Sequence, residues 1–213
     1  MPADQAQSSS RQKQREQTQK RILAAAIDIF AEAGFEASSL ADIAKRASVK
    51  KSLVQYHFAT KDRLWQEAAT QIWNERNKQL AGFVIEATSG QSNADPQSRM
   101  RNAFLAVVKF TRGKPQWLWF MFHEGAVNGE RLQWLIDNFI GEDYTRGQAF
   151  IRDYQTRGLI RAGSPLQLIN LISGALTYNL LVAPQTYRAT DKDMTSEKAL
   201  SEQVDLLLDM LAP

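Results

Sequence analysis

The chain has 213 residues, of which 44% are hydrophobic, and its formal net charge is only +3. A chain of this length and composition can form a hydrophobic core without covalent cross-links. The absence of cysteine excludes disulfides, thiolate nucleophiles and cysteine metal sites. Two histidines without metal-ligand spacing, no Gly-rich phosphate loop and no G-x-S-x-G motif leave little catalytic chemistry, so we expect no enzyme activity, no cofactor and no bound metal.

The N-terminal region begins with a polar segment and continues as a helix. Residues 1–10 are polar and predict a disordered tail. Apolar residues at helical spacing then predict a helix from about 11 to 33 that Gly34 ends, after which Phe35 folds back onto the apolar face. That face contains Ile22, Ile27 and Phe30. The first turns of the helix are basic, with Arg11, Lys13 and Arg15.

Residues 38–64 predict two short helices joined by a tight turn. Ser39 opens a capping-box-like S-x-x-D sequence, so the first helix should run from about 40 to 46. Residues 47–49 would form a three-residue turn, and the second helix should run from about 50 to 57. The segment therefore predicts a helix-turn-helix.

The outward face of the second helix is polar, because Val54 and Phe58 would pack inward. Ammonium groups, a hydroxyl, an amide and a phenol on one face can contact both the phosphates and the base edges of DNA. An ordinary amphipathic helix pair with a solvated charged face would leave the same pattern. The candidate DNA-contacting residues are Ser39, Lys50, Lys51, Ser52, Gln55, Tyr56, His57 and Lys61.

This region resembles the TetR family of transcriptional regulators. The family pattern has an I-L-x-A-A-x-x-x-F-x-x-x-G-[FY] core, paired Ser/Thr, an I-A-x-x-A-G-V-S segment, and a recognition helix ending in Y-x-F or Y-H-F before x-x-K-x-x-L. The matching residues are Ile22, Leu23, Ala25, Ala26, Phe30, Gly34, Phe35, Ser38, Ser39, Ile43, Ala44, Ala47, Val49, Tyr56, His57, Phe58, Lys61 and Leu64.

Three positions distinguish this chain from the family pattern. Ser48 replaces the usual glycine of the turn, which costs about 1 kcal/mol if the position is left-handed. Lys50 replaces the usual Ser or Thr, so a capping side chain is lost while a cation is gained. Many relatives carry Tyr where this chain has Gln55, and glutamine can pair bidentately with adenine. We therefore expect Gln55 to read a base.

Positive charge is concentrated in the same part of the chain. Residues 1–63 contain eleven Lys/Arg and seven Asp/Glu, whereas residues 64–213 contain fifteen and sixteen. A surplus of this size could arise by chance, but it lies where contact with DNA phosphates would use it. The basic start of the first helix is either a solvated helix end or an arm that contacts phosphates or the minor groove.

The rest of the chain predicts helices only. A periodic segment from 61 to about 88 would form a helix of ~40 Å, and Gly, Asn, Asp and Pro in 89–97 predict a loop. Further helices are expected at about 97–112, 115–124, 129–158 with an interruption near Gly141, 165–182 and 196–211. The predicted fold is therefore all-α, with a disordered tail (1–10), a helix-turn-helix DNA-binding domain (11–60), and a helical-bundle domain for effector binding and dimerisation (61–213).

The resemblance implies that the helical bundle encloses a pocket for a small-molecule effector. Such a pocket needs a few polar groups placed in apolar walls, although aromatic residues at helical spacing more often form an ordinary core. Glu124 and His123 could equally form a helix-end salt bridge and a hydrogen-bonded core histidine. The candidate ligand-binding residues are Trp117, Phe120, His123, Glu124, Tyr154, Tyr178 and Asn179.

The resemblance also implies a homodimer, formed by a four-helix bundle of the last two helices of each subunit. These helices carry more apolar surface than a small bundle needs, although ordinary packing within the chain could use it. Two-fold symmetry would place the recognition helices ~34–36 Å apart on a palindromic operator. The candidate interface residues are Ile172, Ala175, Leu176, Val204, Leu207 and Leu208.

Together these expectations describe a ligand-responsive transcriptional regulator. The main hypothesis is a repressor that binds double-stranded operator DNA as a homodimer and is released by a small-molecule effector. The alternatives are a transcriptional activator and a non-specific DNA-binding protein without an effector. With no basic-then-apolar leader and no uninterrupted apolar run near 18 residues, we expect a cytoplasmic protein without a membrane partner.

Overall fold

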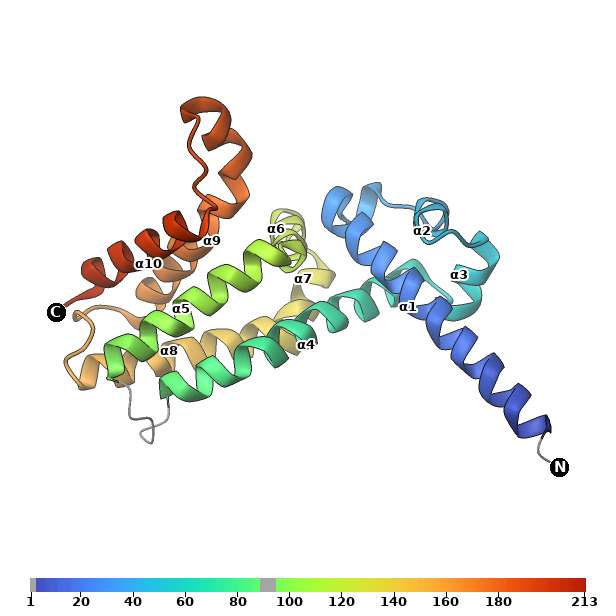
Figure 1. Cartoon of the computed structure of the whole chain (residues 1–213), viewed down its shortest axis with the longest axis horizontal. Helices are drawn as coiled ribbons and strands as arrows, with labels where there is room; N and C mark the ends of the chain where they lie inside the picture. The colour runs from blue at the N-terminus through green and yellow to red at the C-terminus, as the bar shows by residue number, and fades with distance from the viewer. Residues whose placement is uncertain (1–2, 89–94) are drawn as a thin grey trace. The chain divides into compact units, whose positions relative to one another are not determined.

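The computed structural model describes the backbone of residues 3–88 and 95–213 and the side chains of residues 11–81 and 95–213. Helices are the only regular elements in these residues, which confirms the all-α class (Figure 1). Residues 89–94, which hold most of the expected loop, lie outside the described residues. The helices are α1 (Ala3–Ala37), α2 (Leu40–Arg46), α3 (Lys51–Phe58), α4 (Lys61–Thr88), α5 (Pro96–Gly113), α6 (Gln116–Val127), α7 (Glu130–Leu135), η1 (Ile136–Ile140), α8 (Gly141–Thr156), α9 (Pro165–Thr190) and α10 (Glu197–Leu211).

The chain forms two compact units. Unit 1 comprises Met1–Asn74 and Gln116–Leu132, and unit 2 comprises Glu75–Pro115 and Gln133–Pro213. This division differs from the expected domains, because unit 1 includes α6 as well as the helix-turn-helix. The helix α4 contributes its first part to unit 1 and its second part to unit 2.

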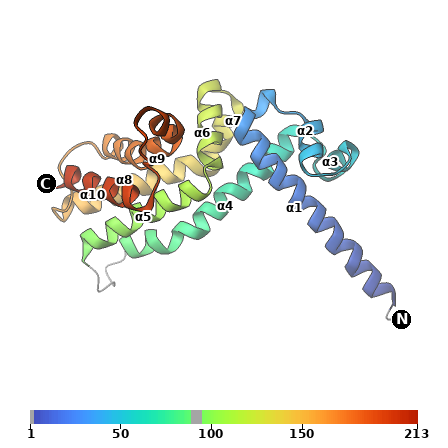
Figure 2. The same ribbon diagram turned by 45° about the horizontal axis from the view of Figure 1, so that its top comes forward.

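Unit 1 is built around α1, which packs against both α2 and α6, as Figure 2 shows. Its core consists of apolar side chains that α1, α2, α3, α4 and α6 place in the interior at helical spacing. These include Ile22, Phe30, Ile43, Val54, Phe58, Leu64, Trp65, Leu118 and Phe120, all at most 4% exposed.

Helix α1 is longer than expected at both ends. It begins at Ala3, inside the segment whose polar composition predicts disorder, because neither proline nor glycine interrupts the residues from there to 33. At the other end Gly34 adopts φ 73° and ψ 174°, which breaks the helix, and one further turn follows. The ring of Phe35 then stacks on Phe30 with 5.9 Å between ring centroids, as the sequence predicts.

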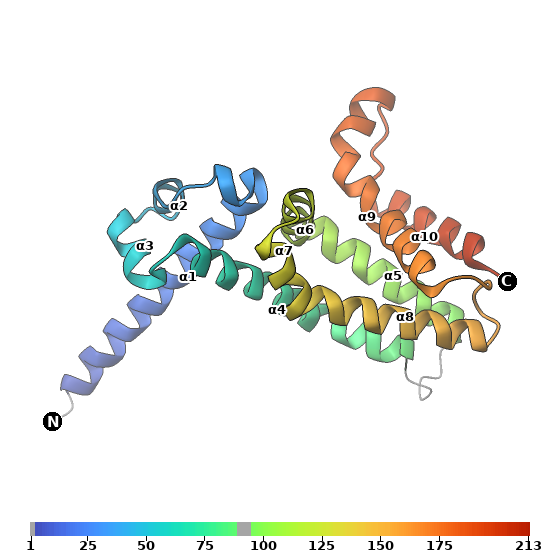
Figure 3. The same ribbon diagram turned by 180° about the vertical axis from the view of Figure 1, so that it is seen from behind.

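Unit 2 is a helical bundle in which α9 packs against α5, α8 and α10 (Figure 3). Helix α10 illustrates why these segments fold as they do, since its apolar residues recur every three or four positions and cover one face. Those buried residues are Leu200, Val204, Leu207, Leu208 and Leu211. The same core receives Met100, Phe104, Val108, Ile151, Tyr154, Leu168, Ile172 and Leu176.

The segment from Glu130 to Thr156 is helical throughout but changes its winding. The sequence predicts one helix over 129–158 with an interruption near Gly141. The interruption is a π-helix, η1, which ends immediately before Gly141. A Cβ added to Gly141 would lie 3.0 Å from the carbonyl oxygen of Ile136. A residue with a side chain would therefore be crowded at the end of the π-helix, whereas glycine is not.

Helix α9 extends eight residues beyond the predicted end at 182. It passes through Pro184, which is exposed, so that water can replace the backbone hydrogen bond that proline removes. Within the described ranges α9 is also the one helix long and apolar enough by composition to cross a membrane, with mean hydropathy 1.4 over a window that is 22% buried. Core helices of soluble proteins pass the same test.

Candidate nucleic-acid interface and effector domain

The start of α2 has the predicted capping geometry. The hydroxyl of Ser39 accepts a hydrogen bond from the backbone N–H of Asp42 at 3.1 Å and donates one to the Asp42 carboxylate at 2.5 Å. The donor and one acceptor site of this hydroxyl are therefore used inside the protein. The structure thus gives Ser39 a structural role next to the candidate DNA contacts.

The turn between α2 and α3 is a Schellman-type helix end. The N–H of Val49 donates to the carbonyl of Ala44 at 2.9 Å, and the N–H of Ser48 donates to the carbonyl of Lys45 at 3.1 Å. Ser48 occupies the left-handed position of this motif with φ 54°, where glycine is the usual residue. The strain predicted from the sequence is therefore present.

Replacing Ser48 by glycine is expected to raise the free energy of unfolding by about 0.5–1 kcal/mol, because glycine adopts positive φ without a Cβ clash. Denaturant titration of the two proteins measures the difference. Ala41→Gly, at an exposed position inside α2, is the control and should lower stability by a similar amount. If Ser48→Gly lowered the free energy of unfolding, the claim that Ser48 is strained at positive φ would be wrong.

Helix α3 presents a polar face that is held by buried residues. Val54 and Phe58 lie in the core at 0% and 4% exposure, which fixes the rotation of the helix. Lys50 is the N-cap residue, and its side chain makes no capping hydrogen bond. The opposite face is exposed, and it carries Lys50, Lys51, Ser52, Gln55 and Tyr56.

The last two candidates, His57 and Lys61, are only partly exposed. The ring of His57 lies edge-on to Tyr56 with 5.3 Å between centroids, and burial followed by the charge of Arg15 lowers the pKa of His57 below its usual value. The ammonium of Lys61 lies 4.1 Å from the ring centre of Phe35. Lys61 is thus engaged by a cation–π contact inside unit 1.

The lowered pKa of His57 predicts a pH dependence of stability. Above the unfolded pKa, near 6.5, histidine is neutral in both states. As pH falls from there to the folded pKa, the unfolded chain takes up a proton first, so the free energy of unfolding should decrease. Urea titrations between pH 7.5 and 5.5 should show a smaller decrease in His57→Gln than in the parent. An equal decrease would contradict the assignment.

Four of the candidate ligand-binding residues, Trp117, Phe120, His123 and Glu124, lie in unit 1. The ring of Phe120 contacts Trp65 and Phe30 at centroid distances of 5.7 and 6.2 Å. Trp117 is buried as well. Phe120 therefore belongs to the apolar core that α1, α4 and α6 form in unit 1.

His123 connects α6 to the last part of α1, and Glu124 connects α6 to α7. His123 Nε2 lies 3.1 Å from the carbonyl oxygen of Ala31, three residues before the break at Gly34. A Cβ added at Gly34 would lie 3.2 Å from the imidazole, so glycine is required for this approach as well as for the positive φ. Glu124 is 2% exposed and accepts a hydrogen bond from Arg131 Nε at 3.0 Å.

The three remaining candidates lie in unit 2, Tyr154 on α8 and the adjacent Tyr178 and Asn179 on α9. The Tyr154 hydroxyl is in the core and donates to the carbonyl of Pro96 at 3.3 Å, and burial raises the pKa of Tyr154. Tyr178 is 64% exposed. Asn179 donates hydrogen bonds to Gln203 and to the carbonyl of Met194. The structure therefore does not bring the seven predicted residues together in one pocket.

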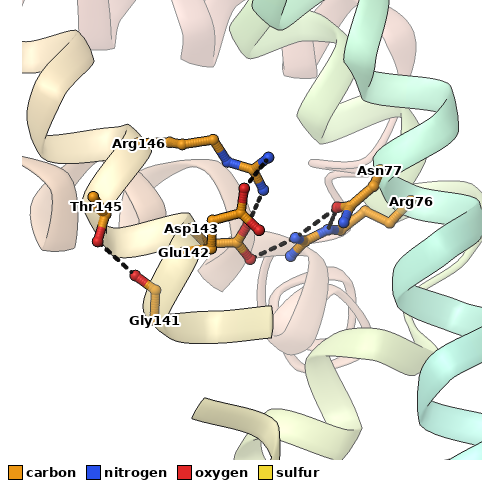
Figure 4. A network of polar contacts seen from close by, with 7 residues as sticks. All are labelled: Arg76, Asn77, Gly141, Glu142, Asp143, Thr145 and Arg146. Carbon is orange, nitrogen blue, oxygen red and sulfur yellow. Dashed lines mark hydrogen bonds and ion pairs between the residues drawn. The ribbon is translucent and has the colours of Figure 1, made fainter. Parts of the chain in front are cut away.

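An ion-pair network in unit 2 was missed by sequence reasoning. The buried Arg76 on α4 donates to the Asp143 carboxylate on α8 at 2.5 Å and to Asn77 at 2.9 and 3.1 Å (Figure 4). Asp143 is shared with Arg146, which also binds Glu142. One signal was available, because Arg76 is a charged residue at the position between Ile72 and Leu80 in the apolar helical series of this segment.

A second feature of unit 2 is an open depression of about 290 Å³ between α5 and α10. Its centre is the ion pair of Arg101 with Asp205, whose carboxylate pKa this guanidinium lowers. None of the candidate ligand-binding residues lines it. The lining residues are Asp95, Gln97, Ser98, Arg101, Asp205, Leu208 and Asp209.

The candidate interface residues are mostly internal. Ile172, Leu176, Val204, Leu207 and Leu208 are at most 6% exposed and belong to the core of unit 2, while Ala175 packs against that core. The more apolar face of each helix is therefore used within the chain. The exposed apolar residues of α9 and α10 lie on other faces and include Leu166, Leu171, Tyr178, Tyr187, Leu206 and Met210.

These features define the class of protein: an all-α DNA-binding protein with an N-terminal helix-turn-helix and a separate helical domain. Residues 22–68 match the family model described as bacterial regulatory proteins, tetR family. Over 205 residues the chain is 26% identical to the HTH-type transcriptional regulator AcrR of Shigella flexneri, covering 92% of this chain and 89% of that protein. The chain therefore carries the DNA-binding domain of TetR-family transcriptional regulators.

Two further comparisons agree with this assignment. The HTH-type transcriptional repressor Rv3405c of Mycobacterium tuberculosis is 52% identical over 50 residues, which cover 24% of this chain and 27% of that protein. The structure of AibR in complex with isovaleryl coenzyme A and operator DNA has the same fold, with a TM-score of 0.70 at 19% identity over 92% of this chain and 98% of AibR. The matched proteins are regulators, in agreement with the expectation that the chain is not an enzyme.

Proposed function

We propose that this regulator is a repressor that binds palindromic operator DNA as a homodimer and is released by a small-molecule effector. The observation that carries the proposal is the exposed polar face of α3, whose rotation is fixed by buried Val54 and Phe58. In this proposal Lys50 and Lys51 contact phosphates, and Gln55 pairs with a base edge. Acting on bacterial transcription, such a protein would work in the cytoplasm.

The dimer is proposed to form through the exposed apolar face of α9 and α10. Leu171, Gly174 and Tyr178 follow one another at helical spacing on α9, and Leu206 and Met210 do so on α10. The side chains of Leu206 and Met210 are 61% and 65% exposed in the single chain. A row of exposed apolar residues along a helix is typical of a protein interface, and a second copy would cover these rows by two-fold symmetry.

Effector binding is proposed for unit 2, with α4 as the element that transmits it. The relative AibR binds both isovaleryl coenzyme A and operator DNA, which supports a coupling of this kind. In this chain α4 begins three residues after α3 and continues into unit 2, where Arg76 binds Asp143. A ligand would release DNA only to the extent that it binds the DNA-free conformation more tightly.

The test is selection of bound sequences from a random duplex library by the purified protein at near-physiological salt. Enrichment of one palindrome supports an operator-specific dimer, and Gln55→Ala should then relax selection at a single symmetric pair of positions. Retention of DNA only at low salt, without enrichment, would overturn the proposal in favour of a non-specific DNA-binding protein. Transcription from the selected site distinguishes repression from activation.

A further inference from the structure

The N-terminal end of α1 carries a basic face that continues the face packed in the core. Residues 11, 15, 18 and 22 are separated by four, three and four positions and therefore lie on one side of the helix. Ile22 is fully buried and Thr18 is partly buried, whereas Arg15 and Arg11 are exposed. All three views show this end of α1 extending past the other helices of unit 1 (Figures 1, 2 and 3).

This face is next to the recognition helix. The guanidinium of Arg15 lies 5.8 Å from the ring centre of Tyr56, which is 68% exposed on α3. The positive charge of Arg15 also contributes to the lowered pKa of His57. Arg11 lies one turn further along α1, about 6 Å beyond Arg15 along the helix axis.

The local charge favours an anion as the partner of this face. No acidic residue occurs from 43 to 61, the stretch that contains most of α2, the turn and all of α3. The one acidic residue in the first turns of the described part of α1 is Glu16, which accepts a hydrogen bond from Gln12. Two guanidiniums at the edge of a DNA-binding face, without a described acidic partner, are suited to phosphates.

We propose that Arg11 and Arg15 bind the phosphodiester backbone of the DNA that flanks the sequence read by α3. Helix α1 thereby acts as a rigid arm that extends the contact of each subunit with the duplex. This inference rests on the proposed binding of operator DNA and adds a second DNA-contacting element to it. The arm supplies affinity and position without selecting a base sequence, because phosphates are the same at every step.

The test measures the salt dependence of binding to the palindrome recovered from the library selection. Each phosphate contact contributes about 0.9 to the slope of log affinity against log salt, so Arg11→Gln/Arg15→Gln should lower the slope by about two per subunit. Lys13→Gln/Lys20→Gln is the matched control, because it removes the same charge from the opposite side of α1. Glutamine preserves helix propensity in both variants.

Two further measurements separate direct contact from an effect through Tyr56. Arg11→Gln alone, one turn away from that ring, should lower the slope by about one per subunit. Duplexes that contain the palindrome without flanking DNA lack the phosphates that the arm is proposed to bind. On such duplexes the salt-dependence slope of the parent protein should fall to that of the double variant. If the variants bind the operator with the same slope as the parent, the proposed phosphate contacts of Arg11 and Arg15 are wrong, whereas the proposed function stands. Failure of the parent to bind any sequence specifically would overturn both.

Discussion

Leu206→Glu is expected to produce a folded monomer whose operator affinity is lower by about 100-fold or more. The side chain is exposed in the single chain, so the substitution costs little within unit 2. In the proposed dimer it would place a carboxylate in an apolar interface, where an unpaired charge is strongly unfavourable. A monomer reaches one half-site only and loses the avidity of the second. Analytical ultracentrifugation and titration of the operator measure the two effects.

The neighbouring residue provides the control. Leu207 is 6% exposed in the core of unit 2, so Leu207→Glu should lower the free energy of unfolding by about 4 kcal/mol or more instead of giving a folded monomer. Circular dichroism during denaturation distinguishes loss of folding from loss of dimerisation. If Leu206→Glu remained a dimer with full operator affinity, the interface would have to lie on another face.

Arg131→Ala is expected to lower the free energy of unfolding of unit 1 by about 3–5 kcal/mol. Glu124 is almost fully buried, and Arg131 is the cation that binds its carboxylate. Removal of the guanidinium leaves a buried charge without compensation, which is among the most costly single changes. The same substitution also removes the guanidinium that lies 3.7 Å from the ring centre of Phe35. Urea titration followed by tryptophan fluorescence measures the loss.

Two variants separate the buried pair from the exposed one. Arg131 also binds Glu36, a largely exposed carboxylate, so Glu36→Ala should change stability by less than about 1 kcal/mol. Adding Glu124→Gln to Arg131→Ala removes the uncompensated charge and should restore part of the lost stability. Equal losses for Glu36→Ala and Arg131→Ala would show that burial of Glu124 is not the cause.

Features that depend on neighbouring residues could be predicted from the sequence. The cap at Ser39 and the left-handed turn at Ser48 involve groups within five positions of each other. The rotation of α3 follows from two apolar residues four positions apart, Val54 and Phe58, which leaves the polar candidates outside. These are local consequences of helix geometry, and the resemblance to a known family relied on the same spacings.

The packing of α6 is harder to predict from the sequence, because this helix gives no clear periodic signal. Aromatic residues occur on several sides of this helix, so composition does not indicate which side is buried. The structure buries Phe120 against α1 and leaves Phe122 half exposed. It therefore places His123 against the carbonyl of Ala31 near the end of α1, and Glu124 against Arg131 on α7. His123 and Ala31 are about ninety residues apart in the chain, so helical spacing gives no sign of their contact.

The sequence by itself determined the all-α class, the helix-turn-helix, its capping and turn, and the exposed polar face of α3, because helical periodicity and caps act over a few residues. Only the tertiary structure decided that Leu207 is internal while Leu206 is exposed, that α6 packs with α1, and that Arg76 finds Asp143 sixty-seven positions away. The physical reason is that burial depends on which apolar face of a helix packs against another element. When a helix is apolar on more than one side, its own sequence does not contain that choice.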